Sequence, residues 1–199
     1  MSNPGDADTT PIRSVRQLAD YIAVGCKPRA EFRIGTEHEK FGFRNADLIA
    51  PPYDGAPGSI RVMLEGLARL GRGEPILDHG NPIGLTLGGG ASVSLEPAGQ
   101  LELSGAPLAT LHDTKAELDG HLAAVRAVAG PLGLGFAPLG FHPTMTREAM
   151  PWMPKGRYAI MRAYMPKVGG LGLDMMTRTC TVQVNLDYAS EQDMLRKLR

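Results

Sequence analysis

The chain has little of what would place it in several common classes of protein. It has 2 cysteines among 199 residues, 6% aromatic residues, and 21 basic residues that balance 21 acidic ones. Two cysteines, Cys26 and Cys180, are too few for a disulfide framework or a zinc cage, so we expect reduced thiols and a cytoplasmic location. The neutral charge balance argues against nucleic acid or an anionic membrane as a partner. No apolar run approaches the roughly 18 residues of a membrane span.

Several catalytic signatures are missing as well. There is no Gly-x-x-x-x-Gly-Lys-Ser/Thr sequence, so Gly88–Gly90 predicts a flexible turn and not a P-loop. The pair His38-Glu39 lacks the second histidine of a zinc protease motif, and no Gly-x-Ser-x-Gly nucleophile elbow occurs.

What the sequence does contain is the pattern of a mixed α and β protein. Residues 1–13 are polar with two prolines and predict a disordered tail, followed by one domain at 14–199. The predicted helices begin after the capping residues Ser14 and Ser59, run from near Thr110 to Ala129, span Arg157–Tyr164, and start again at Ser190. In the third helix the predicted buried stripe is Leu111, Leu118, Leu122, Val125 and Ala129. The predicted strands are Glu31–Arg44, several short ones within 75–104, Leu134–Phe141 and Met176–Tyr188.

Three of these strand regions carry polar side chains on one face, because residues two apart in a strand point the same way. The shared faces hold Glu37 and Glu39; then Ser92, Ser94 and Glu96 with Gln100, Glu102 and Ser104; and then Thr177, Thr179, Thr181, Gln183, Asn185 and Asp187. A solvated face of an antiparallel sheet would look similar. However, the carboxylates do not alternate with basic residues, and neighbouring like charges repel unless something compensates them.

Clustered carboxylates and amides suit a hard divalent cation. Mg²⁺ takes oxygen ligands, keeps several waters, and typically bridges one or two carboxylates to substrate phosphates. The composition of the polar face therefore supports a magnesium and phosphate site as a hypothesis, with a solvated sheet face as the alternative.

Four segments resemble a known family. They are Gly35–Phe41, Ser94–Gly105, Met153–Tyr158 and Met176–Asp187. Their sequences are similar to signature segments of the glutamate–cysteine ligases of plant and alphaproteobacterial type, and the likeness runs from about Ser14 to Arg199. Several long motifs in the expected order make this resemblance far more specific than a single glycine pattern.

The resemblance implies an α+β fold similar to glutamine synthetase, with a curved, mostly antiparallel sheet and helices packed on one face. It implies transfer of the γ-phosphate of ATP to the side-chain carboxylate of L-glutamate, followed by attack of the α-amine of L-cysteine. This is the first step of glutathione biosynthesis. ATP and Mg²⁺ are the implied cosubstrate and cofactor, because Mg²⁺ neutralises the charge of the phosphates.

The resemblance also suggests roles for particular residues. The implied metal ligands are Glu37, Glu39, Glu96 and Glu102, and the implied catalytic residues are Glu37, Glu39, Glu96 and Arg157. Nucleotide or substrate contacts are assigned to Gln100, Gln183, Asn185 and Arg162. A guanidinium group suits a carboxylate or phosphate clamp, although both arginines could equally be solvated charges on a helix.

Members of this family are considerably longer, so we expect this chain to be the N-terminal part of a truncated catalytic domain, inactive by itself. Two other functions fit the same residues. One is a related carboxylate–amine ligase with a different amine acceptor, and the other is a non-catalytic domain that binds Mg²⁺ and a nucleotide. An amine-substrate screen would separate the first, and nucleotide binding without phosphoryl transfer would favour the second.

Overall fold

One long strand connects the rest of the sheet. The computed structural model describes residues 9–199. In it, β1 (Ile34–Arg44) pairs antiparallel with three other strands. Its first part lies between β5 (Leu101–Ser104) and β7 (Val182–Leu186), and its last part pairs with β6 (Leu134–Ala137). The predicted first strand is confirmed, although it begins a few residues later than expected.

Three further strands extend the sheet beyond β5. They are β2 (Glu74–Asp78), β3 (Asn81–Thr86) and β4 (Ser92–Leu95). The strand order is β2-β3-β4-β5-β1-β6 with β7 also paired to β1, and every pairing is antiparallel. Between β3 and β4 the chain turns through the short 3-10 helix η2 (Gly88–Gly90), where a turn was predicted. The protein is therefore of the α+β class with a mostly antiparallel sheet, as the sequence indicated.

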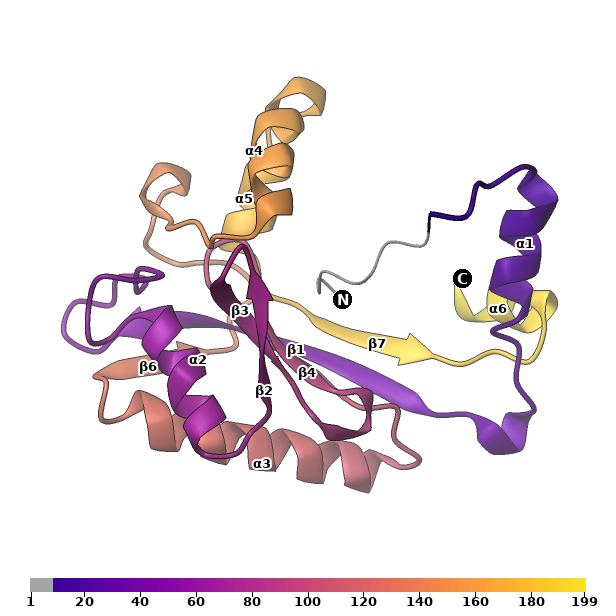
Figure 1. The fold of residues 1–199 in the computed structure, drawn as a ribbon, viewed down its shortest axis with the longest axis horizontal. Helices are drawn as coiled ribbons and strands as arrows, with labels where there is room; N and C mark the ends of the chain where they lie inside the picture. Colours follow the sequence, from indigo (N-terminus) through magenta and orange to yellow (C-terminus); the bar gives the residue numbers. More distant parts are fainter. Residues whose placement is uncertain (1–8) are drawn as a thin grey trace.

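Two helices, α2 (Ile60–Arg69) and α3 (Leu111–Ala129), pack against the sheet (Figure 1). Both begin where the sequence predicts, because the hydroxyls of Ser59 and Thr110 accept hydrogen bonds from backbone N–H groups of the first turn. The core between helices and sheet contains Ile60, Met63, Leu64, Leu67, Leu85, Val93, Leu95, Leu101, Val125, Ala129 and Leu134. Burying each large aliphatic side chain contributes about 1.5–3 kcal/mol.

The buried stripe predicted for α3 is only partly correct. Val125 and Ala129 are buried, whereas Leu111 is 71% exposed and His121 occupies a buried position instead. The reason is that the buried residues of α3 all lie in its second half, which packs against α2 and β6. The first turn of the helix therefore carries Leu111 outside the core.

The strand predicted over Met176–Tyr188 is wrong in its first part, which is the helix α5 (Gly172–Arg178). Asp174 pairs with Arg178 one turn later at 3.1 Å, and the hydroxyl of Thr177 donates to the carbonyl of Leu173 at 2.8 Å. Contacts between residues four apart stabilise a helix. The alternating threonines that suggested one strand thus begin within a helix, and only the later part of the predicted range forms the strand β7.

Helix α4 (Gly156–Val168) is longer than the predicted Arg157–Tyr164 and packs with α5 above one end of the sheet (Figure 1). Between β6 and α4 lies the short 3-10 helix η3 (Arg147–Ala149), which contacts α5. These elements bring residues from the second half of the chain close to the turn between β4 and β5.

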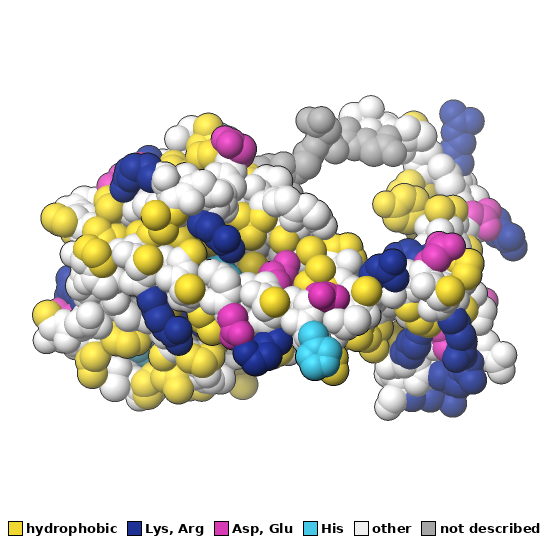
Figure 2. Space-filling view, turned by 90° about the horizontal axis from the view of Figure 1, so that it is seen from below, with side chains coloured by type: hydrophobic (Ala, Val, Ile, Leu, Met, Phe, Trp, Pro, Cys, Tyr) yellow, Lys and Arg dark blue, Asp and Glu magenta, His cyan; other side chains and the backbone are white. Residues whose placement is uncertain are grey.

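A small lobe lies apart from the sheet body, beyond the far ends of β1 and β7 (Figure 1). It consists of α1 (Val15–Ala23), the 3-10 helix η1 (Arg29–Glu31) and α6 (Glu191–Lys197). Figure 2 shows Lys and Arg side chains gathered on this lobe. The helices predicted after Ser14 and Ser190 are both confirmed.

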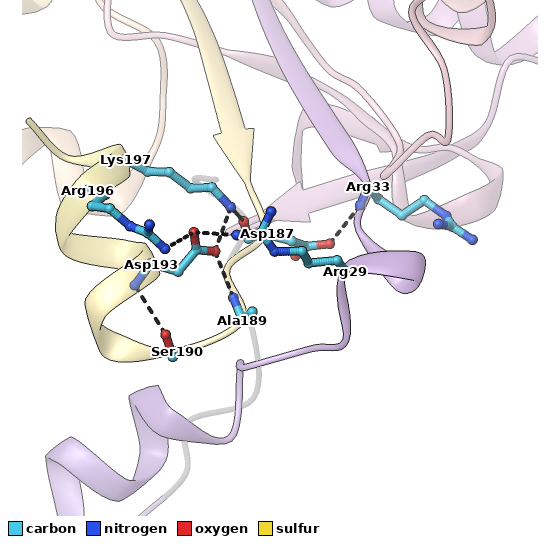
Figure 3. A network of polar contacts seen from close by, with 8 residues as sticks. All are labelled: Arg29, Arg33, Asp187, Ala189, Ser190, Asp193, Arg196 and Lys197. Atoms are coloured by element: carbon cyan, nitrogen blue, oxygen red, sulfur yellow. Dashed lines mark hydrogen bonds and ion pairs between the residues drawn. The ribbon is translucent and has the colours of Figure 1, made fainter.

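Two aspartates, one directly after β7 and one in α6, form a polar network where the chain leaves β7 (Figure 3). The buried carboxylate of Asp193 accepts from the backbone N–H of Ala189 at 3.0 Å and from Lys197 at 2.9 Å. Asp187 accepts from Lys27 at 2.7 Å and from the backbone N–H of Arg33 at 2.8 Å. Hydrogen bonds to charged groups each contribute about 1.5–3 kcal/mol when they are sheltered from water, so this network fixes the end of the strand.

Residues 9–13 of the predicted tail are exposed and have no regular structure, and the rest of that tail lies outside the described residues. Within residues 9–199, no helix combines the length and the hydropathy needed to cross a bilayer.

Candidate active site

The acidic residues share the sheet face opposite the apolar core. In the strand register Glu39 lies opposite Glu102, and Glu37 lies opposite both Ser104 and Gln183. Directly opposed residues of antiparallel strands point to the same face. The common face predicted for these side chains is therefore confirmed, while their chemical roles stay predictions.

At one end of this face lies a cavity of about 210 Å³. It is enclosed by β1, the residues around the start of β7, the turn after β4, and the helices α4 and α5. Its walls are Glu39, Glu96, Pro97, Gln100, Arg157, Tyr158, Met161, Met175, Met176, Thr179, Thr181 and Gln183. The cavity thus contains five predicted site residues, namely Glu39, Glu96, Gln100, Arg157 and Gln183.

Glu39 is held in place by the segment that leads into β7. Its carboxylate accepts a hydrogen bond from the backbone N–H of Thr181 at 2.9 Å and another from the Thr181 hydroxyl at 3.0 Å. Burial raises the pKa of Glu39, and the charges of Glu102 and Glu37 raise it further, while the bonds from Thr181 oppose these effects. The side chain is therefore fixed in position by the segment that leads into β7.

Glu96 stands at a tight turn between β4 and β5. The turn closes through bonds from the Glu96 N–H to the Gln100 carbonyl and from the Gly99 N–H to the Glu96 carbonyl, both 2.9 Å. Gly99 has φ of 85°, a conformation that suits glycine. Burial raises the pKa of Glu96 to about 7, and the charges of Glu102 and Glu39 add to this, against the opposing effect of Lys155 and Arg157.

The other two predicted metal ligands are already bonded to the protein. Glu102 is buried, and its two oxygens accept from the hydroxyls of Ser94 at 2.6 Å and Ser104 at 2.8 Å. Glu37 accepts from the side-chain amide of Asn185 at 2.9 Å. Neither residue lines the cavity, so both lie behind or beside the two carboxylates that do.

The predicted polar contacts separate into two groups. Gln183 lines the cavity and donates to Thr181 at 3.0 Å. Gln100 is buried, and its amide nitrogen donates to the carbonyls of Met176 at 3.1 Å and Thr179 at 3.0 Å while its oxygen accepts from the N–H of Ala98. Gln100 therefore joins the β4–β5 turn to α5, which gives it a structural role in shaping the cavity wall.

The two predicted arginines also differ. Arg157 lines the cavity, with its guanidinium 5.2 Å from the centre of the Tyr158 ring. Arg162 stacks over the ring of Trp152 at 4.8 Å and does not line the cavity. Arg157 is thus the arginine that can reach an anionic group in this site.

Sequence reasoning missed Lys155 and Tyr158. Both are buried, and the Lys155 ammonium at 2.6 Å and the Tyr158 hydroxyl at 2.7 Å donate to the same carbonyl, that of Leu95. Burial lowers the pKa of Lys155 to about 8, with Glu96 opposing the change. Burial raises the pKa of Tyr158. The segment Met153–Tyr158 was part of the family resemblance, but only the fold shows that its lysine lies beside the turn that carries Glu96.

The cavity offers two carboxylates as possible ligands for magnesium. Among residues 9–199, no group of three or more His, Cys, Asp or Glu side chains is arranged to hold a metal ion alone. Mg²⁺ in nucleotide sites typically takes one or two carboxylates and completes its shell with phosphate oxygens and water. Glu39 and Glu96 face one cavity, and the pKa of each is raised partly by other carboxylates. These two side chains therefore match the one or two protein carboxylates that Mg²⁺ takes in a nucleotide site.

Comparison with known proteins gives a consistent result. The family model described as Glutamate-cysteine ligase family 2 matches residues 33–199. Glutamate–cysteine ligase A of Oryza sativa subsp. japonica is 57% identical over 182 residues, which are 92% of this chain and 36% of the relative. The ligase of Medicago truncatula is 54% identical over 184 residues, 92% of this chain and 35% of the relative. The ligase of Arabidopsis thaliana is 56% identical over 182 residues, 92% of this chain and 34% of the relative.

The chain spans about a third of the length of these curated relatives, all of which are named chloroplastic. Their location contradicts the cytoplasmic one expected from the sequence. A low cysteine content indicates a reducing environment but does not identify the compartment, so that expectation was wrong. The match over residues 33–199 covers most of the chain, and the chain therefore belongs to glutamate–cysteine ligase family 2.

Proposed function

We propose that the protein acts in the ATP-dependent ligation of L-glutamate to L-cysteine, the first step of glutathione biosynthesis. The observation that supports this most directly is the cavity in which Glu39 and Glu96 face Arg157 and Gln183. It occurs in a chain that is 54–57% identical to relatives named glutamate–cysteine ligases. Because the chain spans about a third of those relatives, the proposal assigns it a part of the site.

The proposed reaction has two steps. An oxygen of the glutamate γ-carboxylate attacks the γ-phosphorus of ATP, the bond to the bridging oxygen breaks, and ADP leaves with that oxygen. The amine of cysteine then attacks the acyl carbon of γ-glutamyl phosphate, inorganic phosphate leaves, and the nitrogen loses a proton. Positioning and charge neutralisation supply most of the rate enhancement in such phosphoryl transfers.

Particular residues would carry these tasks. Glu39 and Glu96 would hold Mg²⁺, which when bound neutralises the phosphate oxygens. Glu37 and Glu102, both satisfied by protein donors, would add negative charge behind them. Arg157 would bind a carboxylate or phosphate, since a guanidinium offers several donors in one plane.

The supporting residues would maintain this geometry. Lys155 and Tyr158 fix the backbone that precedes Glu96 through the Leu95 carbonyl. Gln183 and Asn185 offer amides on the same face, and Arg162 remains a more distant candidate for substrate contact because it stacks on a tryptophan. We further propose that the sheet is part of a glutamine synthetase-like fold, in which an antiparallel sheet forms the floor of the site.

The test uses the rice relative as a host. The matching segment of that enzyme is replaced by this chain, and γ-glutamylcysteine formation is measured with MgATP, glutamate and cysteine, beside the chain alone. We expect activity in the hybrid and none in the chain alone. In the hybrid, Glu39→Gln and Glu96→Gln should each lower kcat/KM by about 100-fold or more.

The matched control is Glu74→Gln, an exposed glutamate on β2 away from the cavity. It should leave kcat/KM within about twofold of the parent hybrid, since surface substitutions rarely matter. Loss of activity in the control and the two site variants alike would contradict the assignment. A hybrid that binds MgATP without forming product would favour a binding domain, and product with another amine only would favour a different ligase.

A further inference from the structure

A second cavity, of about 300 Å³, lies on the other side of the sheet from the acidic residues. It opens between the second half of α3 and the strands β1 and β6. Apolar walls come from Leu122, Val125, Leu134 and Phe136, and two cationic side chains, Lys40 and Arg126, complete the polar part. No carboxylate is among the described residues that line it.

Lys40 is the unusual member of this cavity. It lies opposite Leu101 in the register, so its side chain leaves β1 on the apolar face, and it is only 4% exposed. Its ammonium donates to the His38 carbonyl at 3.4 Å, a long bond for a charged donor. Within residues 9–199 no Asp or Glu forms an ion pair with it. Buried ammonium groups are normally paired, because burying an unpaired charge is strongly unfavourable.

Two histidines lie close enough to Lys40 for its charge to lower their pKa values. His121 on α3 is 3% exposed, and its Nε2 atom has no hydrogen-bond partner in the described part of the chain. The Nε2 atom of His38 is buried and unbonded in the same way. Burial lowers the pKa of Lys40, and the Cys180 thiol near it is kept neutral because burial raises its pKa. The interface between β1 and α3 therefore holds an ammonium group without an ion pair among the described residues, and neither the two imidazoles nor this thiol supplies a negative charge.

We propose that this cavity is a binding site for a small monocarboxylate with an apolar body, whose carboxylate pairs with Lys40. The hydrocarbon part would contact Leu122, Val125 and Phe136, and Arg126 would lie at the mouth. The volume is at the lower end of that of ligand sites, so the ligand is a small one, for which hexanoate has a suitable size. A phosphate dianion fits less well, because Gly130 places the negative end of the α3 dipole in the same wall.

The test measures binding of hexanoate to the full chain by calorimetry and by backbone amide NMR. Hexanamide, which has the same carbon chain without the charge, and inorganic phosphate are the comparison probes. We expect saturable hexanoate binding that shifts the amide signals of Leu122, Val125 and Phe136, with hexanamide and phosphate each at least about 10-fold weaker.

Two variants assign the effect to this site. Lys40→Met keeps the length of the side chain and should weaken hexanoate binding at least about 10-fold, while Lys115→Met, which changes an exposed lysine of α3, should leave it unchanged. Ala129→Leu narrows the cavity without removing a charge and should also abolish binding. Thermal unfolding without ligand should show that Lys40→Met is at least as stable as the parent.

Several outcomes would overturn the proposal. They are equal hexanoate binding by the parent and Lys40→Met, hexanamide binding as strong as that of hexanoate, and a preference for phosphate. A lower unfolding temperature for Lys40→Met would also overturn it, because that result would mean that the ammonium already has a stabilising partner in the protein. Absence of saturable binding in the parent would do the same.

Discussion

Replacing Glu96 by glutamine is expected to stabilise the protein at pH 8 and to have a much smaller effect at pH 5. The carboxylate lies at the turn after β4, partly buried, with Glu102 and Glu39 close enough to repel it. Glutamine keeps the shape of the side chain and removes the charge. The substitution therefore isolates the electrostatic effect of bringing this carboxylate into an acidic cluster.

The expected magnitude comes from the difference between the pKa of Glu96 in the folded protein, about 7, and its ordinary value of 4.5. At about 1.4 kcal/mol for each pH unit between the two pKa values, the full difference corresponds to about 3.5 kcal/mol. Solvent screening of a partly exposed group reduces this to about 1–3 kcal/mol. Between pH 4.5 and 7 the unfolded chain loses this proton while the folded protein keeps it. The free energy of unfolding of the parent therefore falls as the pH rises through this interval, relative to the variant.

The assay is urea denaturation followed by circular dichroism at pH 5, 6, 7 and 8, without added magnesium. The parent, Glu96→Gln and the control Glu74→Gln are compared at each pH. The advantage of Glu96→Gln should grow steadily with pH and level off above pH 7, whereas the control should show no such trend. A constant difference at all four pH values, or a variant less stable than the parent at pH 8, would refute the reasoning.

Three other predictions follow from the same site. Ser94→Ala should lower the free energy of unfolding by about 1–3 kcal/mol, because Glu102 loses a buried donor; an unchanged urea midpoint would argue against this. Gln100→Met should destabilise the protein by about 2–4 kcal/mol, since both halves of its amide are bonded to backbone; calorimetric unfolding would measure the loss. Mg²⁺ competes with protons on Glu39 and Glu96, so it should raise the unfolding temperature more at pH 8 than at pH 6, and equal effects would contradict this assignment.

Local chemistry in the sequence was sufficient to predict most helices and one face of the sheet. Hydroxyl residues such as Ser59 and Thr110 begin helices because they satisfy backbone N–H groups that a helix leaves free. The alternation of Glu37 and Glu39 placed both on one side of a strand, and the same rule applied to Glu102. These predictions succeed because they depend on residues that are close together in the chain.

Contacts between distant segments could not be predicted in this way. The role of Gln100 depends on the carbonyls of Met176 and Thr179, which approach only when α5 packs against the turn after β4. The position of Lys155 likewise depends on the Leu95 carbonyl, and the burial of His121 on how α3 meets the sheet. Periodicity also failed at Thr177, because a threonine hydroxyl can bond within a helix as well as face out from a strand.

The attachment of β7 at its two ends fixes which of its side chains lie on the acidic face of the sheet. Between those ends the strand is exposed on both sides, and among the described strands it pairs with β1 alone, so by itself it could shift along its neighbour. A shift of one residue would turn Gln183 and Asn185 away from the acidic face. The bond from Gln100 to Thr179 at one end, and the aspartate network around Asp187 at the other, act as two fixed points that allow a single alignment. Substitutions far from the cavity, within the lobe of α6, would thus alter which side chains a substrate meets.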